Sequence, residues 1–339
     1  MATTPRASLM SPSTLARPFT DGVYCPLITP FKRDTEAIDF DALQTQVVRL
    51  ANARMGIVVL GTNGEASHLS DKERSAVIRA TREALDTNGF TQIPILAGTG
   101  TGSAKETIRL SNEAREAGAD YVIVIPPGYF SFALGRDLPS LKKFFIDVLD
   151  GSPLPVMIYN FPGAASGIDF NSDFLIDLAE HQNCFGAKLT CAMVGKGHRL
   201  SAHTSSAAYK ARHPRPFFVM PGFSDILLPA LVSRASGCIT GTGNIIPKTI
   251  VKLYDTAIAA LATGGVEQLE AARELQDLVA EADWAVVKAG IGGTKYAMDA
   301  YIQAGLGGVP RSPLPPAGTE IKALLATGLK RALAYENSL

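Results

Sequence analysis

The chain has 339 residues, of which 46% are hydrophobic and 19% are charged, and its 32 basic side chains balance 32 acidic ones. This composition excludes an intrinsically disordered chain, and the even charge argues against a nucleic-acid or membrane-surface partner. No stretch reaches the roughly 18 apolar residues that a bilayer span needs. The length accommodates one barrel of about 250 residues with an appendage, or two ordinary domains. We therefore expect a small molecule as the partner.

The first twenty residues bear on where the protein resides. Residues 1–20 are rich in Ser, Thr, Ala and Pro and contain no acidic residue before Asp21. This composition predicts a disordered tail, and it also resembles a mitochondrial transit peptide, although its prolines oppose an amphipathic helix. The four cysteines form no Cys-x-x-Cys pair, which indicates reduced thiols. We expect a cytoplasmic protein, with a mitochondrial location as the alternative.

Eight short apolar runs follow, and amphipathic segments separate them. The runs are continuous rather than alternating, which is typical of parallel strands covered on both faces. The expected strands are residues 23–28, 57–60, 93–97, 121–125, 156–159, 185–188, 217–220 and 238–240. Eight such units favour a closed barrel over an open sheet. We therefore predict an α/β fold, a (β/α)₈ TIM barrel that spans residues 21–262 as the catalytic domain.

Helix boundaries can be predicted at several points between these strands. Ser70 and Ser103 each precede a glutamate by three residues, as in a capping box, and each is expected to start a helix. Gly118 and Gly237 stand just ahead of strands and are expected to end helices.

The last part of the chain, residues 263–339, has no strand signal. Its clearest helices are expected at residues 267–287 and 322–335, around a loop rich in proline and glycine at 305–316. This pattern predicts a helical C-terminal extension that packs on the barrel or on another subunit.

Barrel enzymes carry their site at the carboxyl ends of the strands, and two residues stand out there. Lys188 lies in an otherwise apolar strand, where desolvation would lower its pKa and free an amine to attack a carbonyl. The alternative is a lysine that reaches from the strand end to solvent or to Glu65. Tyr159 ends the preceding strand and could donate or relay a proton, or it could simply cap the core.

Two loops at the same end of the barrel add candidates. Residues 61–65, Gly-Thr-Asn-Gly-Glu, follow the second strand and could form a nest of N–H groups for a carboxylate or phosphate, or an ordinary turn. Tyr129 lies on the loop after the fourth strand, where a tyrosine is more often a packing or interface residue.

Four segments together resemble the dihydrodipicolinate synthase / N-acetylneuraminate lyase family. They are residues 61–65, 159–162 (Tyr-Asn-Phe-Pro), 186–188 (Gly-Ala-Lys) and 237–247, in the order and spacing of that family. The resemblance extends from about Asp21 to the C-terminus. It implies a barrel enzyme that binds a pyruvate-containing 2-oxo acid as a covalent imine, needs no further cofactor and assembles as a homotetramer.

The resemblance also implies roles for individual residues. Lys188 matches the Schiff-base lysine and Tyr159 the proton-shuttling tyrosine. Thr62 and Asn63, in the turn that Gly61 opens, match the pair that holds the pyruvyl carboxylate. Tyr129 matches a tyrosine that family members often lend to a neighbouring subunit. The backbone positions that line the pocket match Gly222 and Ile239.

The substrate is expected to be a 2-keto-3-deoxy sugar acid. Dihydrodipicolinate synthases have an arginine shortly after the Tyr-Asn-x-Pro segment, but residues 163–167 (Gly-Ala-Ala-Ser-Gly) lack one. Asn63 resembles the 4-hydroxy-2-oxoglutarate aldolases and the fungal 2-keto-3-deoxy-sugar-acid aldolases, and small residues such as Ala66 and Ala164 leave room for a hydroxylated chain. We expect cleavage of an L-threo-3-deoxy-hexulosonate to pyruvate and glyceraldehyde. A 4-hydroxy-2-oxoglutarate aldolase or a dihydrodipicolinate synthase-like condensing enzyme is the alternative.

Three other classes are less consistent with the sequence. A metal-dependent enzyme would need clustered ligands, but no His-x-His or His-Glu-x-x-His occurs, and His198 and His203 are expected to face different directions on one helix. Residues 98–103 suggest a dinucleotide loop, but Ser103 replaces its third glycine. A catalytically silent barrel that only binds is disfavoured because both Lys188 and Tyr159 are present.

Overall fold

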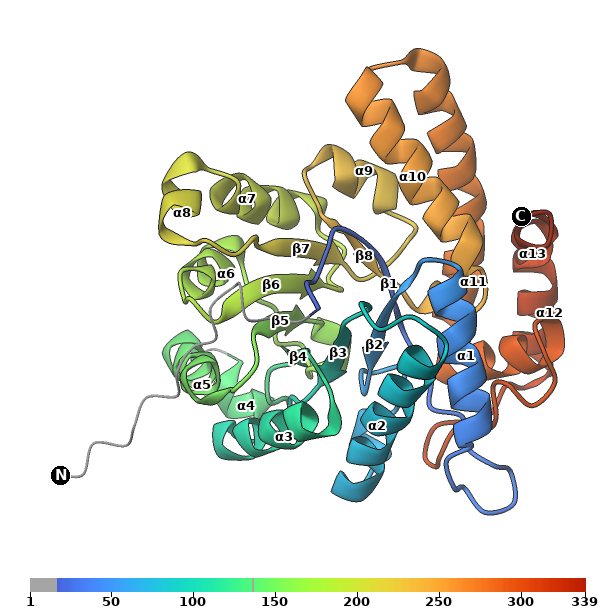
Figure 1. Cartoon of the computed structure of the whole chain (residues 1–339), viewed down its shortest axis with the longest axis horizontal. Helices are drawn as coiled ribbons and strands as arrows, with labels where there is room; N and C mark the ends of the chain where they lie inside the picture. Colours follow the sequence, from blue (N-terminus) through green and yellow to red (C-terminus); the bar gives the residue numbers. More distant parts are fainter. Residues whose placement is uncertain (1–16, 136) are drawn as a thin grey trace.

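A computed structural model describes residues 17–135 and 137–339 (Figure 1). Eight parallel strands surround one axis, with helices outside them. The strands are β1 (Gly22–Pro26), β2 (Gly56–Val59), β3 (Ile95–Gly98), β4 (Tyr121–Val124), β5 (Val156–Asn160), β6 (Cys184–Leu189), β7 (Phe218–Pro221) and β8 (Gly237–Ile239). Each predicted strand is confirmed to within two residues at either end.

The barrel is nearly closed. The strands pair in the order β7-β6-β5-β4-β3-β2-β1-β8, and every pair is parallel. The ladder is interrupted between β7 and β8, where the Ser236 amide donates to the Val219 carbonyl at 2.9 Å. The predicted (β/α)₈ barrel with a helical C-terminal extension is therefore confirmed.

Helices follow the strands around the outside of the barrel. The longer ones are α1 (Phe40–Asn52), α2 (Asp71–Thr87), α3 (Ala104–Ala117), α5 (Leu138–Gly151), α6 (Ser172–Ala179), α7 (Val194–Thr204) and α10 (Pro247–Thr263). The shorter ones are η2 (Ala66–His68), α4 (Ser131–Leu134), η3 (Pro162–Ala164), α8 (Ala207–Arg212), α9 (Leu227–Val232) and η4 (Gly241–Asn244). The buried faces of the longer helices pack on the strands and form the larger core.

The predicted helix boundaries are confirmed with one exception. Ser70 forms a complete capping box, Ser103 accepts from the Glu106 amide, and Gly118 ends α3 in the left-handed conformation. Gly237, predicted to end a helix, instead begins β8, because α9 already ends at Val232. Glycine is required there because its φ is 150° and a Cβ atom would lie 1.7 Å from the Gly22 carbonyl oxygen of the neighbouring strand.

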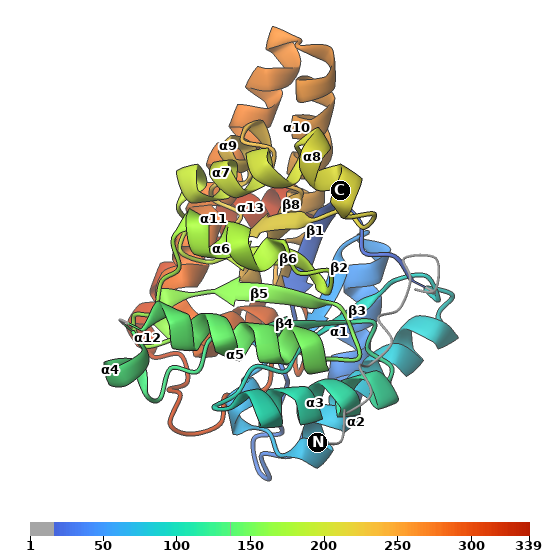
Figure 2. The ribbon, with the colours of Figure 1, turned by 90° about the vertical axis from the view of Figure 1, so that its left-hand side faces the viewer.

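The C-terminal extension contains three helices, α11 (Val266–Tyr301), α12 (Thr319–Gly328) and α13 (Lys330–Glu336). The first predicted helix continues 14 residues further than expected, across a kink at Gly290. The second begins earlier than expected and is divided between α12 and α13. Helix α10 and the first half of α11 form an antiparallel pair that projects from the barrel (Figures 1 and 2).

The start of the described chain closes the amino-terminal end of the barrel. Phe19 is 5% exposed, stacks on Tyr24 with ring centroids 4.2 Å apart, and donates its amide to the Tyr121 hydroxyl at 2.9 Å. The predicted tail lies outside the described residues up to residue 16. At residues 17–20 the chain packs instead of being disordered, because Phe19 fills the apolar space between the strands.

Within the described residues, no helix combines the length and the apolar character that crossing a membrane requires.

Candidate active site

Lys188 and Tyr159 face each other across two neighbouring strands inside the barrel. They are register partners of β6 and β5, and Lys188 is only 6% exposed. The Nζ atom of Lys188 lies 4.5 Å from the centroid of the Tyr159 ring. Because both strands are parallel, both side chains project at the carboxyl end of the barrel, where the sequence predicted them.

The loop after β2 brings Thr62 to the same point. The Thr62 Oγ1 atom lies 3.3 Å from the Tyr159 hydroxyl, so a proton can pass between them. The turn is sharp, with Glu65 in the left-handed conformation at φ 51°, and the Thr29 hydroxyl holds the Gly64 carbonyl at 2.7 Å. Among the described residues, nothing accepts a hydrogen bond from the Thr62 or Asn63 amide. Both N–H groups can therefore bind an anion.

These residues line one cavity. It encloses about 860 Å³, including space open to solvent, which is ample for a six-carbon acid. Its walls include the predicted residues Thr62, Asn63, Tyr159, Lys188 and Gly222. Two other residues predicted to belong to the site do not line this cavity. Gly61 lines the adjoining hollow described below, and Ile239 is fully buried in the barrel interior.

Tyr129 does not reach this cavity within one chain. It is 86% exposed on the loop between β4 and α4, beside the exposed rings of Phe130 and Phe132. The structure of a single chain therefore separates Tyr129 from the other predicted site residues.

Helix α11 supplies a wall of the cavity that the sequence did not predict. Asp283 is 1% exposed, and its Oδ1 accepts from the hydroxyls of Ser224 at 2.8 Å, Thr240 at 3.1 Å and Thr242. Burial raises the pKa of Asp283. These bonds fasten α11 to the loops after β7 and β8, next to the interruption of the sheet.

A second carboxyl lies close to Asp283. Burial, and then the charge of Asp283, raise the pKa of Asp225 to about 6. The charge of Asp283 disfavours ionisation of Asp225, so the loop after β7 carries a carboxyl group whose pKa is raised next to the cavity wall.

The loop after β2 is fixed from the C-terminal extension by a buried ion pair. Glu65 is 2% exposed and Lys295 is 0% exposed, and the Lys295 Nζ lies 2.5 Å from Glu65 Oε1. Lys295 also donates to the carbonyls of Thr29 at 2.7 Å and Val309 at 2.8 Å. Burial lowers the pKa of Lys295 to about 8, although the Glu65 carboxylate opposes the shift.

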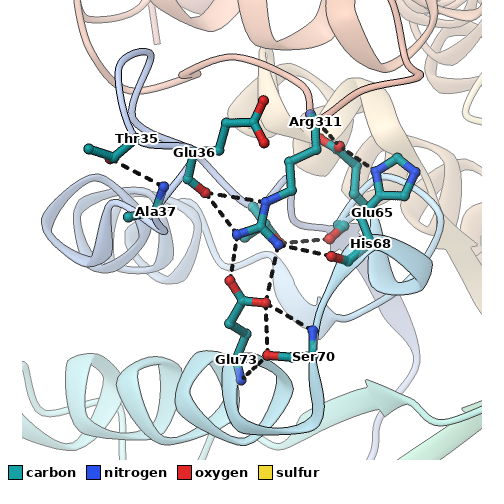
Figure 3. A network of polar contacts seen from close by, with 10 residues as sticks. Thr35, Glu36, Ala37, Glu65, His68, Ser70, Glu73 and Arg311 are labelled. Carbon is teal, nitrogen blue, oxygen red and sulfur yellow. Dashed lines mark hydrogen bonds and ion pairs between the residues drawn. The ribbon is translucent and has the colours of Figure 1, made fainter.

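Arg311 joins the same network (Figure 3). Its amide donates to Glu65 Oε2 at 2.9 Å, and its guanidinium contacts the carbonyls of Glu36 and His68 and the carboxylate of Glu73. Hydrogen bonding from Arg311 lowers the pKa of Glu73 to about 2. The extension and the loop are thus held together at the mouth of the barrel by groups far apart in the sequence.

A hollow adjoins the Lys188 cavity. Thr62, Tyr159 and Ile291 line both, so the two spaces adjoin at these residues. Ala164 lines this hollow. It belongs to the segment 163–167, which lacks the arginine of the dihydrodipicolinate synthases. In the part of the chain that the structure describes, no group of three or more His, Cys, Asp or Glu residues is arranged to hold a metal ion.

Comparison with known proteins places this barrel in a family. The model of the dihydrodipicolinate synthetase family matches residues 19–332. The chain belongs to that family. The resemblance predicted from the four sequence motifs is therefore confirmed.

Relatives within the dihydrodipicolinate synthetase family carry more than one name. The chain is 38% identical to the L-threo-3-deoxy-hexylosonate aldolase of Aspergillus niger, over 95% of this chain and 98% of that protein. It is 37% identical to a protein of Emericella nidulans named "Probable 4-hydroxy-2-oxoglutarate aldolase, mitochondrial", over 95% and 98% of the two chains. YagE, a family member from E. coli K12 solved in complex with pyruvate, has a TM-score of 0.76 at 29% identity and covers 92% of this chain and 98% of its own.

Proposed function

We propose that the protein is a class I aldolase that binds its 2-oxo acid as an imine on Lys188. The observation that supports this most directly is the buried amine of Lys188, 4.5 Å from the Tyr159 ring centroid, with Thr62 3.3 Å from the Tyr159 hydroxyl. A desolvated lysine next to a proton relay is the arrangement that imine chemistry needs. The pyruvate bound to YagE and the aldolase names of the fungal relatives agree with it.

The proposed reaction uses only residues of this chain and needs no further cofactor. The Thr62 and Asn63 amides hold the C1 carboxylate, which directs the C2 ketone to Lys188. The Nζ lone pair attacks C2, and Tyr159 gives its proton to the departing water, so that a protonated imine and a Tyr159 phenolate form. Tyr159 accepts the proton of the C4 hydroxyl while the C3–C4 electrons move into the imine, and the aldehyde departs. The enamine takes a proton at C3, and water hydrolyses the imine to release pyruvate.

We propose a 2-keto-3-deoxy-hexonate of the L-threo type as the substrate, with glyceraldehyde as the second product. The adjoining hollow, where the aldehyde half would lie, is lined by small residues such as Gly61, Ser67 and Ala164 and by larger apolar ones such as Leu60, Ile123 and Leu314. The charged group lining it is Glu65, which Lys295 already balances. A neutral hydroxylated chain is compatible with such a space, whereas a second carboxylate would find no free cation among the described lining residues.

The name of the Emericella nidulans relative favours a second candidate, 4-hydroxy-2-oxoglutarate. The two substrates differ at the distal end, which is a hydroxylated carbon chain in one and a carboxylate in the other. Pyruvate release from both, followed with excess lactate dehydrogenase, gives the two kcat/KM values. We expect a higher kcat/KM for the hexonate; a higher value for 4-hydroxy-2-oxoglutarate would favour the second candidate.

We further propose a homotetramer in which Tyr129 reaches a neighbour's site. The exposed rings of Tyr129, Phe130 and Phe132 form an apolar surface of the kind that subunit contacts cover. Light scattering of the full chain would give the mass, and Tyr129→Ala should lower activity only if the assembly forms. We also propose that the protein is cytoplasmic. The name of the Emericella nidulans relative includes "mitochondrial", so cell fractionation should test whether this protein is imported into mitochondria instead.

A further inference from the structure

We propose that His68 determines substrate specificity by accepting a hydrogen bond from a distal hydroxyl of the aldehyde half. This proposal rests on the aldolase function above and names the residue that would distinguish a hydroxylated aldehyde from one without hydroxyls.

His68 lies in the right place for this role. It lines the hollow that adjoins the Lys188 cavity, together with Gly61, Thr62, Tyr159 and Ala164. Because Thr62 and Tyr159 line both spaces, a chain whose C2 is bound to Lys188 would pass the Tyr159 hydroxyl at C4 and place its last carbons in the hollow. The His68 side chain is 21% exposed there.

The ring of His68 is held by one contact to Glu65, and its backbone is held by Arg311 (Figure 3). Its Nδ1 lies 3.1 Å from Glu65 Oε2, and its own carbonyl accepts from the Arg311 guanidinium at 2.9 Å. The short helix η2 that carries it is fixed at Ala66, whose carbonyl accepts from Arg74 at 2.8 Å. A group held in this way binds a ligand without first losing rotamer freedom.

The chemistry of the contact sets the direction of the free hydrogen bond. Glu65 already accepts from the Arg311 amide at 2.9 Å and pairs with Lys295, so it is a carboxylate and can only accept. The His68 Nδ1 must therefore donate to it. In the neutral imidazole this leaves a lone pair on Nε2, which has no partner among residues 17–135 and 137–339. A substrate hydroxyl can donate to that atom, whereas a carboxylate cannot.

Two variants separate this role from a purely structural one. In His68→Asn the amide can still donate to Glu65 but nothing replaces Nε2. In His68→Gln the longer side chain puts an acceptor near the position of Nε2. Condensation of pyruvate with glyceraldehyde is compared with condensation with propanal, which has the same length but lacks the hydroxyls, and the ratio of the two kcat/KM values is the readout.

We expect the wild-type protein to prefer glyceraldehyde, His68→Asn to reduce that preference about tenfold, and His68→Gln to remain within about threefold of wild type. His198→Asn, the same exchange at an exposed position of α7, should leave the ratio unchanged. An unchanged ratio in His68→Asn, whether or not the two kcat/KM values fall together, would overturn the proposal.

Reduction with borohydride in the presence of pyruvate keeps the two proposals apart. An adduct on Lys188 in the wild type and in both His68 variants, with an unchanged ratio, refutes only the role of His68. No adduct in the folded wild type refutes the aldolase function and the role of His68 with it.

Discussion

Removing either partner of the buried ion pair between Glu65 and Lys295 should strongly lower the free energy of unfolding. Both side chains are out of contact with water, at 0% and 1% side-chain exposure, and their Nζ–Oε1 distance is 2.5 Å. Removing one partner of such a pair leaves a buried charge without compensation, which costs about 3–5 kcal/mol. We therefore expect Glu65→Gln and Lys295→Met each to lower the free energy of unfolding by this amount.

The expected loss in the free energy of unfolding corresponds to a shift in Tm that depends on chain length. Unfolding entropy of about 2.1 cal/mol/K per residue, applied to 339 residues, gives a shift in Tm of about 1.4 °C per kcal/mol, and thus about 4–7 °C for each variant. The double variant should lose less than the sum of the single losses, by about 1–3 kcal/mol, because the charge that each single variant leaves unpaired is then absent.

Urea unfolding followed by circular dichroism measures these values. The control is Arg273→Met, which removes an exposed partner of Glu270 on the same helix and should cost less than about 1 kcal/mol. Single losses below 1 kcal/mol at Glu65 and Lys295, or strict additivity in the double variant, would refute the reasoning.

Three further predictions concern the site. Tyr159→Phe should lower kcat by about 10²–10⁴-fold while a pyruvate adduct on Lys188 still forms, because the proton relay is lost but the amine is kept. Ala164→Arg should raise the kcat/KM ratio of glyoxylate over glyceraldehyde in condensation about tenfold, since it places a cation in the hollow. Asp225 has a folded pKa of about 6, above the ordinary 3.8, so the stability that its protonated form contributes is complete below about pH 4 and is lost as the pH rises through 6. Relative to Asp225→Asn, the wild type should therefore lose about 1–2 kcal/mol between pH 4 and 8, after a discount for solvent screening.

Each of these can fail in a recognisable way. Unchanged kcat in Tyr159→Phe would remove Tyr159 from the proton path. An Ala164→Arg protein that is folded but keeps its aldehyde preference would show that the aldehyde lies elsewhere. Parallel pH dependence of unfolding for the wild type and Asp225→Asn would show that Asp225 titrates normally in the folded protein.

The barrel could be predicted from the sequence because its signals are local. Continuous apolar runs identified the strands, and the serine caps identified two helix starts. Gly237 was misread because a glycine before a strand can end a helix or allow close approach of two backbones, and only the contact with Gly22 shows which applies. The packing of Phe19 was not predicted because the composition of residues 1–20 indicates disorder.

The core of the candidate site could also be predicted, since Lys188 is unusual in an apolar strand and Tyr159 ends the next one. The wall formed by Asp283 could not, because on α11 it looks like any acidic residue of an amphipathic helix. The pairing of Glu65 with Lys295 joins positions 230 residues apart and has no local signal. Such long-range contacts depend on how the extension packs on the barrel.

The central claim is the imine on Lys188, and borohydride reduction of the full chain with pyruvate tests it most directly. Intact mass and peptide mapping should show one reduced pyruvyl group per chain, on the peptide that carries Lys188, and Lys188→Met should abolish it. A folded wild-type protein without an adduct, or an adduct on a different lysine, would contradict the account.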